Sequence, residues 1–327
     1  MALHSRSSLG FRYEGLLYIP ILLLTLIGIP GTIVSMRFYG KRIQKSSSST
    51  ALFLTSLAVF DMLSLVSNIP TAISIFYMDE WNEGNKESIT RYFTRIPKYW
   101  SNLVLLLAGT ERLIAVALPH KMATIFTRRV AIVSLIVVII IAPMILVPLA
   151  LDPPFVLVPT NGTITHVQRS VKTFIDPDVL KRLIQMVSVL YFGLPLVGVF
   201  ISNICLVTLL FNRFNSKRGK SVRDTMTSKQ VKELRTTKLV ILVTVIFIVC
   251  MLPLVIMVPI ISVERDAVSI RLMLIMRATS TLLETLNYSM NVYVYYFGSN
   301  DFRKETRGML SSMCGCCKRA TVTPMDD

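Results

Sequence analysis

Three basic side chains are spaced so that they could bind an anion together. Arg91, Arg95 and Lys98 are separated by four and three positions, which places them on one face of a helix. Cations that converge on one surface favour a carboxylate, a phosphate or the acidic side chain of a peptide. If the membrane span begins only near Pro97, Arg91 and Arg95 would instead reach water or lipid headgroups. Both interpretations remain open from the sequence.

A lone acid stands inside an otherwise apolar segment. Asp61 is the one acidic residue of 51–77. An ionised side chain in the middle of hydrocarbon costs roughly 2.5–3.5 kcal/mol on insertion scales. Asp61 therefore needs polar partners or a functional purpose.

The cysteines and one sequon indicate covalent modification. Cys314, Cys316 and Cys317 follow an amphipathic basic stretch near the C-terminus. Cysteines in this context are typical of palmitoylation, and the absence of a fourth nearby ligand makes a zinc site the weaker alternative. Asn161 begins an Asn-Gly-Thr sequon, which predicts glycosylation if this segment lies outside the cell.

The elements that would position these residues follow from composition. The 327 residues are 53% hydrophobic and only 17% charged, with a net charge of +16. The apolar residues come in blocks of about 20, the length that crosses a bilayer as a helix. This pattern excludes a soluble globular enzyme, and no nucleotide-binding loop, zinc-binding histidine pair or nucleophile elbow appears. The sequence predicts a multispanning membrane protein that is not an enzyme.

Seven spans and one amphipathic helix are predicted, which makes the fold class all-α. The predicted spans are 15–37, 51–77, 96–118, 130–151, 184–211, 238–262 and 272–297. The amphipathic stretch at about 299–312 is expected to lie along the membrane surface. The chain then divides into an N-terminal segment 1–14, a bundle 15–298, and a helix with its tail at 299–327.

The distribution of lysine and arginine predicts the orientation. The loop after the first span carries four basic residues and no acid, and the loops after the third and fifth spans are also basic. By the positive-inside rule these loops face the cytoplasm, so 1–14 is extracellular and 299–327 is cytoplasmic. The net charge of +16 then faces anionic lipid and requires no nucleic acid as a partner.

Five short motifs in the expected order resemble the rhodopsin-like (class A) family of G-protein-coupled receptors along nearly the whole chain. They are Leu57-Ala58-Val59-Phe60-Asp61, Glu111-Arg112-Leu113, Cys250-Met251-Leu252-Pro253, Asn291-Val292-Tyr293-Val294-Tyr295 and Phe302-Arg303. Leu113, Met251 and Val292 replace the family's usual tyrosine, tryptophan and proline. The chain is thus similar to a divergent member, of the kind found among invertebrate FMRFamide-type neuropeptide receptors and chemosensory receptors.

The resemblance implies roles for the residues at the cytoplasmic half. Arg112, next to Glu111, would be the switch that meets the G protein, and Glu233 would hold it in the inactive state. Asn291 and Tyr295 would be its partners in the seventh span. Pro253 would be the hinge of the sixth span. Met251 would fill the position of the usual tryptophan, where a flexible side chain can still repack a core.

The resemblance also implies a sodium site, the one cofactor that the sequence suggests. Its ligands would be Asp61, Ser101, Asn287 and Asn291, all with the oxygen atoms that a hard cation prefers. The alternative is a hydrogen-bonded network around a protonated Asp61, without an ion.

The function implied is that of a plasma-membrane receptor that senses an extracellular ligand, most simply a neuropeptide, and activates a heterotrimeric G protein. In the family's register Arg91, Arg95 and Lys98 line the outer cavity, and Glu284 could neutralise Lys98. A small anionic chemosensory ligand, or a decoy that binds without signalling, are the alternatives. Retinal is excluded because 271–296 contains no lysine, and a transporter is disfavoured because no internal repeat is present.

Overall fold

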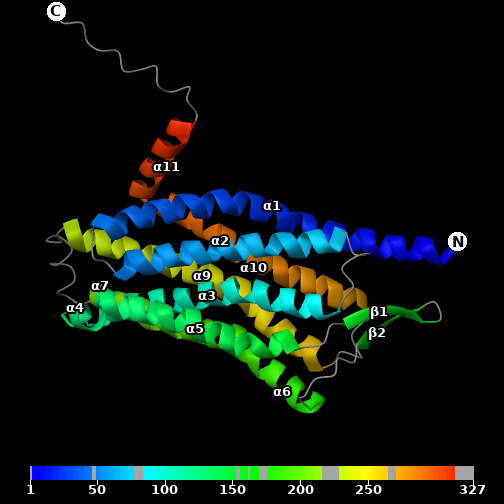
Figure 1. Cartoon of the computed structure of the whole chain (residues 1–327). Helices are drawn as coiled ribbons and strands as arrows, with labels where there is room; N and C mark the ends of the chain where they lie inside the picture. Colours follow the sequence, from blue (N-terminus) through cyan, green and yellow to red (C-terminus); the bar gives the residue numbers. More distant parts are fainter. Residues whose placement is uncertain are drawn as a thin grey trace, which may run out of the picture.

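The computed structural model describes residues 2–45, 49–76, 84–118, 120–151, 155–160, 163–168, 176–215, 228–263 and 270–313. Long helices lie side by side along most of their length (Figure 1). They are α1 (Ala2–Lys45), α2 (Ser49–Phe76), α3 (Gly84–Ala117), α5 (Arg128–Leu151), α7 (Leu194–Asn215), α9 (Ser228–Val263) and α10 (Ile270–Gly298). Shorter helices are α4 (Met122–Ile125), α6 (Pro177–Ser188), the π-helix η1 (Val189–Gly193) and α11 (Asn300–Met313).

Most of the long helices are apolar enough to cross a membrane. Within the described residues six qualify by length and hydropathy: Tyr18–Gln44, Ser49–Pro70, Ile89–Ala117, Arg128–Leu151, Arg182–Asn212 and Thr236–Met257. α10 is not among these six, since it carries buried polar side chains such as Glu284, Asn287 and Asn291. It nevertheless packs against α1 and α9. The predicted bundle of seven spans is therefore confirmed, although hydropathy alone does not identify the last one.

α3 extends beyond the predicted span 96–118 toward the N-terminus. The helix begins at Gly84 and continues through Pro97 to Ala117. Its part Ile89–Ala117 is long and apolar enough to cross a membrane. Arg91, Arg95 and Lys98 all lie on the same continuous helix.

A β-hairpin is the one departure from an all-α chain among the described residues. Strands β1 (Phe155–Thr160) and β2 (Thr163–Gln168) pair antiparallel, with Phe155 opposite Gln168. The hairpin lies at the same end of the bundle as the N-terminus, whereas α4 lies at the opposite end (Figure 1). Asn161, the predicted glycosylation site, lies outside the described residues.

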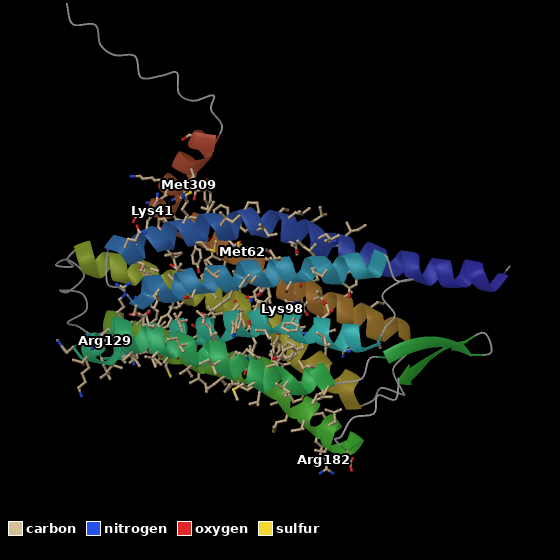
Figure 2. The ribbon with its side chains drawn as sticks, in the orientation of Figure 1. Lys41, Met62, Lys98, Arg129, Arg182 and Met309 are labelled. Carbon is tan, nitrogen blue, oxygen red and sulfur yellow. The ribbon has the colours of Figure 1, made fainter. Side chains whose placement is uncertain are left out.

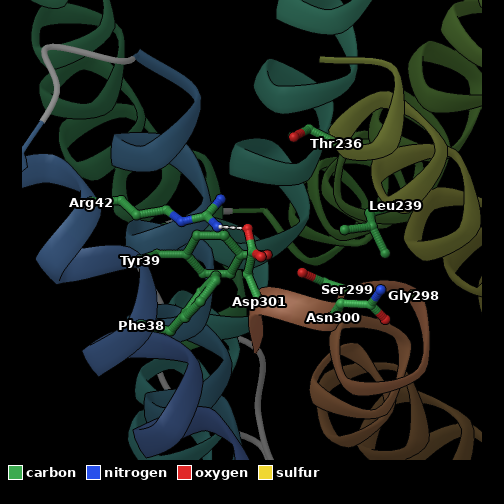
Figure 3. A pocket seen from close by; sticks show the side chains of 9 residues that line it. All are labelled: Phe38, Tyr39, Arg42, Thr236, Leu239, Gly298, Ser299, Asn300 and Asp301. Carbon is green, nitrogen blue, oxygen red and sulfur yellow. Dashed lines mark hydrogen bonds and ion pairs between the residues drawn. The ribbon is translucent and has the colours of Figure 1, made fainter. Parts of the chain in front are cut away.

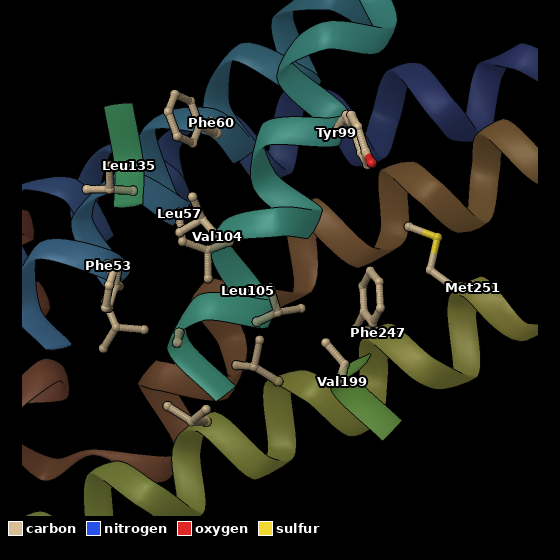
Figure 4. Packing of buried hydrophobic residues seen from close by; sticks show 14 of the residues in the cluster. Phe53, Leu57, Phe60, Tyr99, Val104, Leu105, Leu135, Val199, Phe247 and Met251 are labelled. Atoms are coloured by element: carbon tan, nitrogen blue, oxygen red, sulfur yellow. The ribbon is translucent and has the colours of Figure 1, made fainter. Parts of the chain in front are cut away.

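The core of the bundle is apolar and closely packed. Phe247 and Met251 of α9 face Tyr99 and Leu105 of α3 (Figure 4). Met251 is 1% exposed, so it is a buried core residue at the position where the family resemblance expects a tryptophan.

α11 is held against the C-terminal end of α1 by both apolar and charged contacts. Phe302 is fully buried and packs edge-on against Phe38, with ring centroids 4.9 Å apart. Asp301 pairs with Arg42 at 3.1 Å, and Glu305 pairs with Lys41. The predicted amphipathic helix is therefore present and is fixed to α1. Cys314, Cys316 and Cys317 follow it, outside the described residues.

The close approach of α1 to α10 gives a testable consequence. A Cβ added at Gly28 would lie 2.9 Å from Cβ and 3.3 Å from Cα of Ser289 on α10, so one helix would have to move. We expect Gly28→Ala to lower the stability of the purified protein by about 1–3 kcal/mol, the usual cost of overpacking. Thermal unfolding in detergent measures this.

The matched control is Gly40→Ala on the same helix, because a Cβ there meets nothing within 4 Å. This change should leave the melting temperature unchanged or raise it, since alanine favours helix more than glycine does. Equal effects of the two substitutions would contradict the close helix contact at Gly28.

Candidate functional site

A cluster of charges joins α3 to α10 inside the bundle. One oxygen of Glu284, Oε1, accepts a hydrogen bond from Arg95 NH1 at 2.8 Å. The other, Oε2, accepts one from Lys98 Nζ at 3.0 Å. Glu284 and Lys98 are buried, whereas 32% of the Arg95 side chain is exposed. We call Arg95, Lys98 and Glu284 the charge cluster.

The charge cluster lies in the interior, between the two ends of the bundle. Figure 2 shows Lys98 between Arg129 at one end and Arg182 at the other. The structure thus brings together three of the four predicted ligand-site residues. Arg91, the fourth, is half-buried one turn before Arg95 on α3.

Aromatic rings from η1 form one wall of the charge cluster. The Arg95 guanidinium lies 5.4 Å from the ring centre of Tyr191 and 5.9 Å from that of Phe192. Contacts of this kind between a guanidinium and a ring face are attractive. Neither aromatic residue was predicted as a site residue, although Gly193 and Pro195 follow closely and could have indicated an irregular helical turn.

A proline explains why η1 is fixed to α3. In η1 each N–H bonds to the carbonyl five residues earlier, as Leu194 does to Val189. The next donor would be Pro195, which has no N–H, so the carbonyl of Leu190 needs another partner. The hydroxyl of Tyr99 on α3 donates to it at 3.2 Å. Because Tyr99 is one turn after Arg95, this bond holds the aromatic wall beside the charge cluster.

Two buried hydroxyls next to the charge cluster are unsatisfied. Tyr191 and Tyr288 are 2% and 0% exposed, and neither hydroxyl makes a hydrogen bond of good geometry within the described residues. Buried donors of this kind cost free energy when they are left without an acceptor. An acceptor group entering beside Arg95 would remove that cost.

Asp61 forms a second polar centre, deeper in the bundle. Its Oδ1 accepts a hydrogen bond from Ser101 Oγ at 2.5 Å, and its Oδ2 accepts one from Asn291 Nδ2 at 2.7 Å. Asn287 is also buried, and no bond joins it to Asp61. The side-chain oxygens of Asn287 and Asn291 have no hydrogen-bond partner among the described residues. Together with the Asp61 carboxylate they supply the oxygen atoms that a hard cation requires.

The third centre lies near the other end of α3 and contains Arg112, one member of the predicted latch. Glu111 is fully buried, and its Oε2 accepts bonds from Arg112 Nε at 3.2 Å and NH2 at 3.1 Å. Its Oε1 accepts bonds from Ser49 Oγ at 2.6 Å and Thr50 Oγ1 at 2.7 Å. Both hydroxyls stand at the start of α2, where the helix dipole also favours a negative charge.

The predicted partner of Arg112 is not tested by this geometry. Glu233 lies on α9, but its side chain is outside the described part. In the structure Arg112 bonds to its neighbour Glu111. The run of serines and a threonine at 46–50 was the sequence signal for the hydroxyls at the start of α2.

Tyr295 and Pro253 are the remaining residues that the sequence predicts for switching. Tyr295 is 2% exposed, and its ring packs edge-on against Tyr39 of α1 with centroids 5.2 Å apart. Its hydroxyl has no hydrogen-bond partner within the described residues. Pro253 lies inside α9, two residues after Met251.

A small cavity opens where α1, α9, α10 and α11 meet, and none of its lining residues was predicted as a site residue. Its volume is about 240 Å³. Nine residues line it: Phe38, Tyr39, Arg42, Thr236, Leu239, Gly298, Ser299, Asn300 and Asp301. The Arg42–Asp301 ion pair crosses it (Figure 3).

Comparison with known proteins identifies the family. Residues 33–295 match the family model described as 7 transmembrane receptor (rhodopsin family). Comparison with curated proteins gives no significant match. The family match runs from the middle of α1 to Tyr295 and so includes all three polar centres. The chain therefore belongs to the rhodopsin family of seven-transmembrane receptors.

Proposed function

We propose that the protein is a plasma-membrane receptor that binds an extracellular ligand at the charge cluster and activates a heterotrimeric G protein. The observation that carries this proposal is that one helix, α3, holds an ionic centre near each end. Arg95 and Arg112 are about 25 Å apart along it at the usual helical rise. A ligand at the first centre can change the second only if both centres belong to one element that has two alternative arrangements. Because α3 carries both centres, it can serve as that element.

The proposed orientation places the N-terminal segment 1–14 outside the cell and the tail inside. The positively charged loops between spans support it. Asn161 would then be accessible to glycosylation, and Cys314, Cys316 and Cys317 would be accessible to palmitoylation.

A neuropeptide is the proposed ligand, in line with the resemblance to FMRFamide-type receptors. A small anionic chemosensory ligand is the second candidate, favoured by the two cations of the charge cluster. A decoy that binds without signalling is the third candidate, raised by Leu113, Met251 and Val292. Against it stand the buried Arg112, Asn291 and Tyr295, which a non-signalling protein would not need.

The experiment that tests the proposal is a G-protein activation screen in cells with confirmed surface expression. One pool contains amidated neuropeptides and the other contains small carboxylates. Activation by either pool supports receptor function and selects between the first two candidates. Silence in both pools, with the protein at the surface, would contradict signalling by these ligand classes and favour a decoy.

We also propose that Asp61, Asn291, Asn287 and Ser101 hold a sodium ion. The ion would stabilise the inactive arrangement of α2, α3 and α10 by neutralising the Asp61 carboxylate. The support for this proposal is the set of oxygens without hydrogen-bond partners beside that carboxylate. The alternative remains a hydrogen-bonded network with a proton in place of the ion.

Sodium binding can be tested without a known ligand. The purified receptor should melt at a higher temperature in sodium chloride than in potassium chloride of equal ionic strength, since an ion that binds only the folded state stabilises it. Asp61→Asn should remove this difference.

The control for the sodium test is Ser64→Ala. Ser64 is buried on the same helix, and its hydroxyl donates to the Phe60 carbonyl and not to Asp61, so this variant should keep the wild-type response. A wild-type protein that melts identically in both salts would favour the proton.

A further inference from the structure

We infer that Glu284 competes with the ligand for Arg95. The ligand carries a carboxylate, which replaces the Glu284 carboxylate as the hydrogen-bond partner of Arg95. This inference rests on the proposed function, because it assumes that an extracellular ligand binds at the charge cluster. It adds the chemical class of the ligand and the contact that binding would break.

The first argument is the charge balance. Two cations, Arg95 and Lys98, face the single carboxylate of Glu284. The charge cluster thus keeps one positive charge in surroundings where uncompensated charge is costly. One further negative charge would balance it, so a monoanionic group fits better than a neutral amide or a cation.

The second argument is that the two cations are not equivalent. Lys98 is 5% exposed and gives its ammonium to Glu284 from inside the bundle. Arg95 has 32% of its side chain exposed and contacts Glu284 through NH1 alone. A guanidinium has five N–H groups and binds carboxylates best in a two-point geometry. Arg95 is therefore the cation that can exchange partners, while Lys98 keeps Glu284 neutralised.

The third argument is the pair of unsatisfied hydroxyls. Within the described residues the buried hydroxyls of Tyr191 and Tyr288 make no hydrogen bond of good geometry, and the Tyr191 ring lies against the Arg95 guanidinium. A carboxylate has about four lone-pair sites. It can therefore accept from Arg95 and from both phenols together, which Glu284 does not do in this structure.

The consequence is a release of α10 from α3. While Arg95 is bound to Glu284, the charge cluster ties the two helices by two ion pairs. When a ligand carboxylate binds Arg95, only the Lys98 pair remains. A ligand with this differential contact shifts the population toward the released state, which is what an agonist must do.

The test uses the purified full-length receptor and matched acid–amide probe pairs. The small-molecule pair is benzoate and benzamide, and the peptide pair is a short peptide with glutamate and the same peptide with glutamine. Binding is measured as the rise in melting temperature with probe concentration. We expect at least one acid to stabilise the wild type and its amide to have no effect. The pair that responds shows whether the carboxylate comes from a small acid or a peptide.

The Glu284→Gln variant tests the competition itself. It keeps the side-chain shape and an acceptor for Lys98 but frees Arg95, so the acid should bind about tenfold more tightly. Basal G-protein activation in cells should rise in the same variant. Arg95→Gln should abolish acid binding. Glu305→Gln, on α11 far from the charge cluster, should behave as wild type in both assays.

A second pair of conservative variants controls for loss of binding through misfolding. Glu284→Asp keeps the charge beside Lys98 on a shorter side chain, and Arg95→Lys keeps the positive charge. The inference predicts tighter acid binding in the first and weakened binding in the second. Equal binding of acid and amide, weaker acid binding in Glu284→Gln, or no acid binding in any variant would overturn the inference. Ligand-induced or raised basal G-protein activation under any of those outcomes would leave the proposed receptor function standing.

Discussion

Replacement of Arg112 by alanine should reduce G-protein activation to less than about a tenth of the wild-type level, while the receptor remains folded at the cell surface. A charged side chain such as the Arg112 guanidinium can act as a switch because it can bind one partner in the inactive state and another in the active state. Here one partner is Glu111, at 3.1 Å from Arg112 NH2, and the proposed other partner is the G protein. Alanine removes the group that changes partners.

The fold should survive this substitution. Glu111 would keep two hydrogen bonds, from Ser49 and Thr50, so its carboxylate would still have donors when Arg112 is gone. Arg129→Ala is the matched control, since Arg129 is exposed at the same end of the bundle. Activation by an agonist from the ligand screen is measured together with surface expression. Full signalling by Arg112→Ala would show that another group couples the receptor.

Lys98→Met should destabilise the protein by about 1–3 kcal/mol. Methionine fills the volume of the lysine stem but leaves Oε2 of the buried Glu284 without its donor. Arg95 still neutralises the carboxylate through Oε1, so the cost is that of one buried acceptor left unsatisfied. For a chain of this size the melting temperature should fall by on the order of 5 °C.

The double variant Lys98→Met/Glu284→Gln separates charge from packing. It replaces the carboxylate that has lost one donor by a neutral amide, so it should recover part of the lost stability. Lys121→Met is the control, because Lys121 is exposed and its loss should change the melting temperature little. If the double variant were no more stable than Lys98→Met, the ion pair would not be the source of the effect.

Much of the arrangement around Asp61 could be predicted from the sequence. Asp61, Ser101 and Asn291 are fixed on three helices by motifs at constant spacing, and the structure joins them directly by hydrogen bonds. A helix repeats every 3.6 residues. A motif that places one residue on the inner face of a helix therefore also fixes the faces on which the other residues of the motif lie. The family resemblance implied that Glu284 could neutralise Lys98, and the structure joins the two by an ion pair.

The contacts near helix ends could not be predicted in the same way. The bonds from Ser49 and Thr50 to Glu111 depend on where α2 begins relative to the last turns of α3. The Tyr99 bond to the Leu190 carbonyl depends on a π-helical turn before Pro195. Neither the start of a helix nor a local change in its hydrogen-bond register has a reliable sequence signal.

The sequence by itself determined the class of the molecule, its seven spans and the residues that carry charge inside them. These properties are local, because hydropathy, loop charge and short motifs are read along one segment at a time. The tertiary structure decided which cation holds which acid. Arg95 shares Glu284 with Lys98, and Arg112 is held by Glu111. Partner choice of this kind depends on distances between side chains on different helices, and those distances are set only when the helices pack.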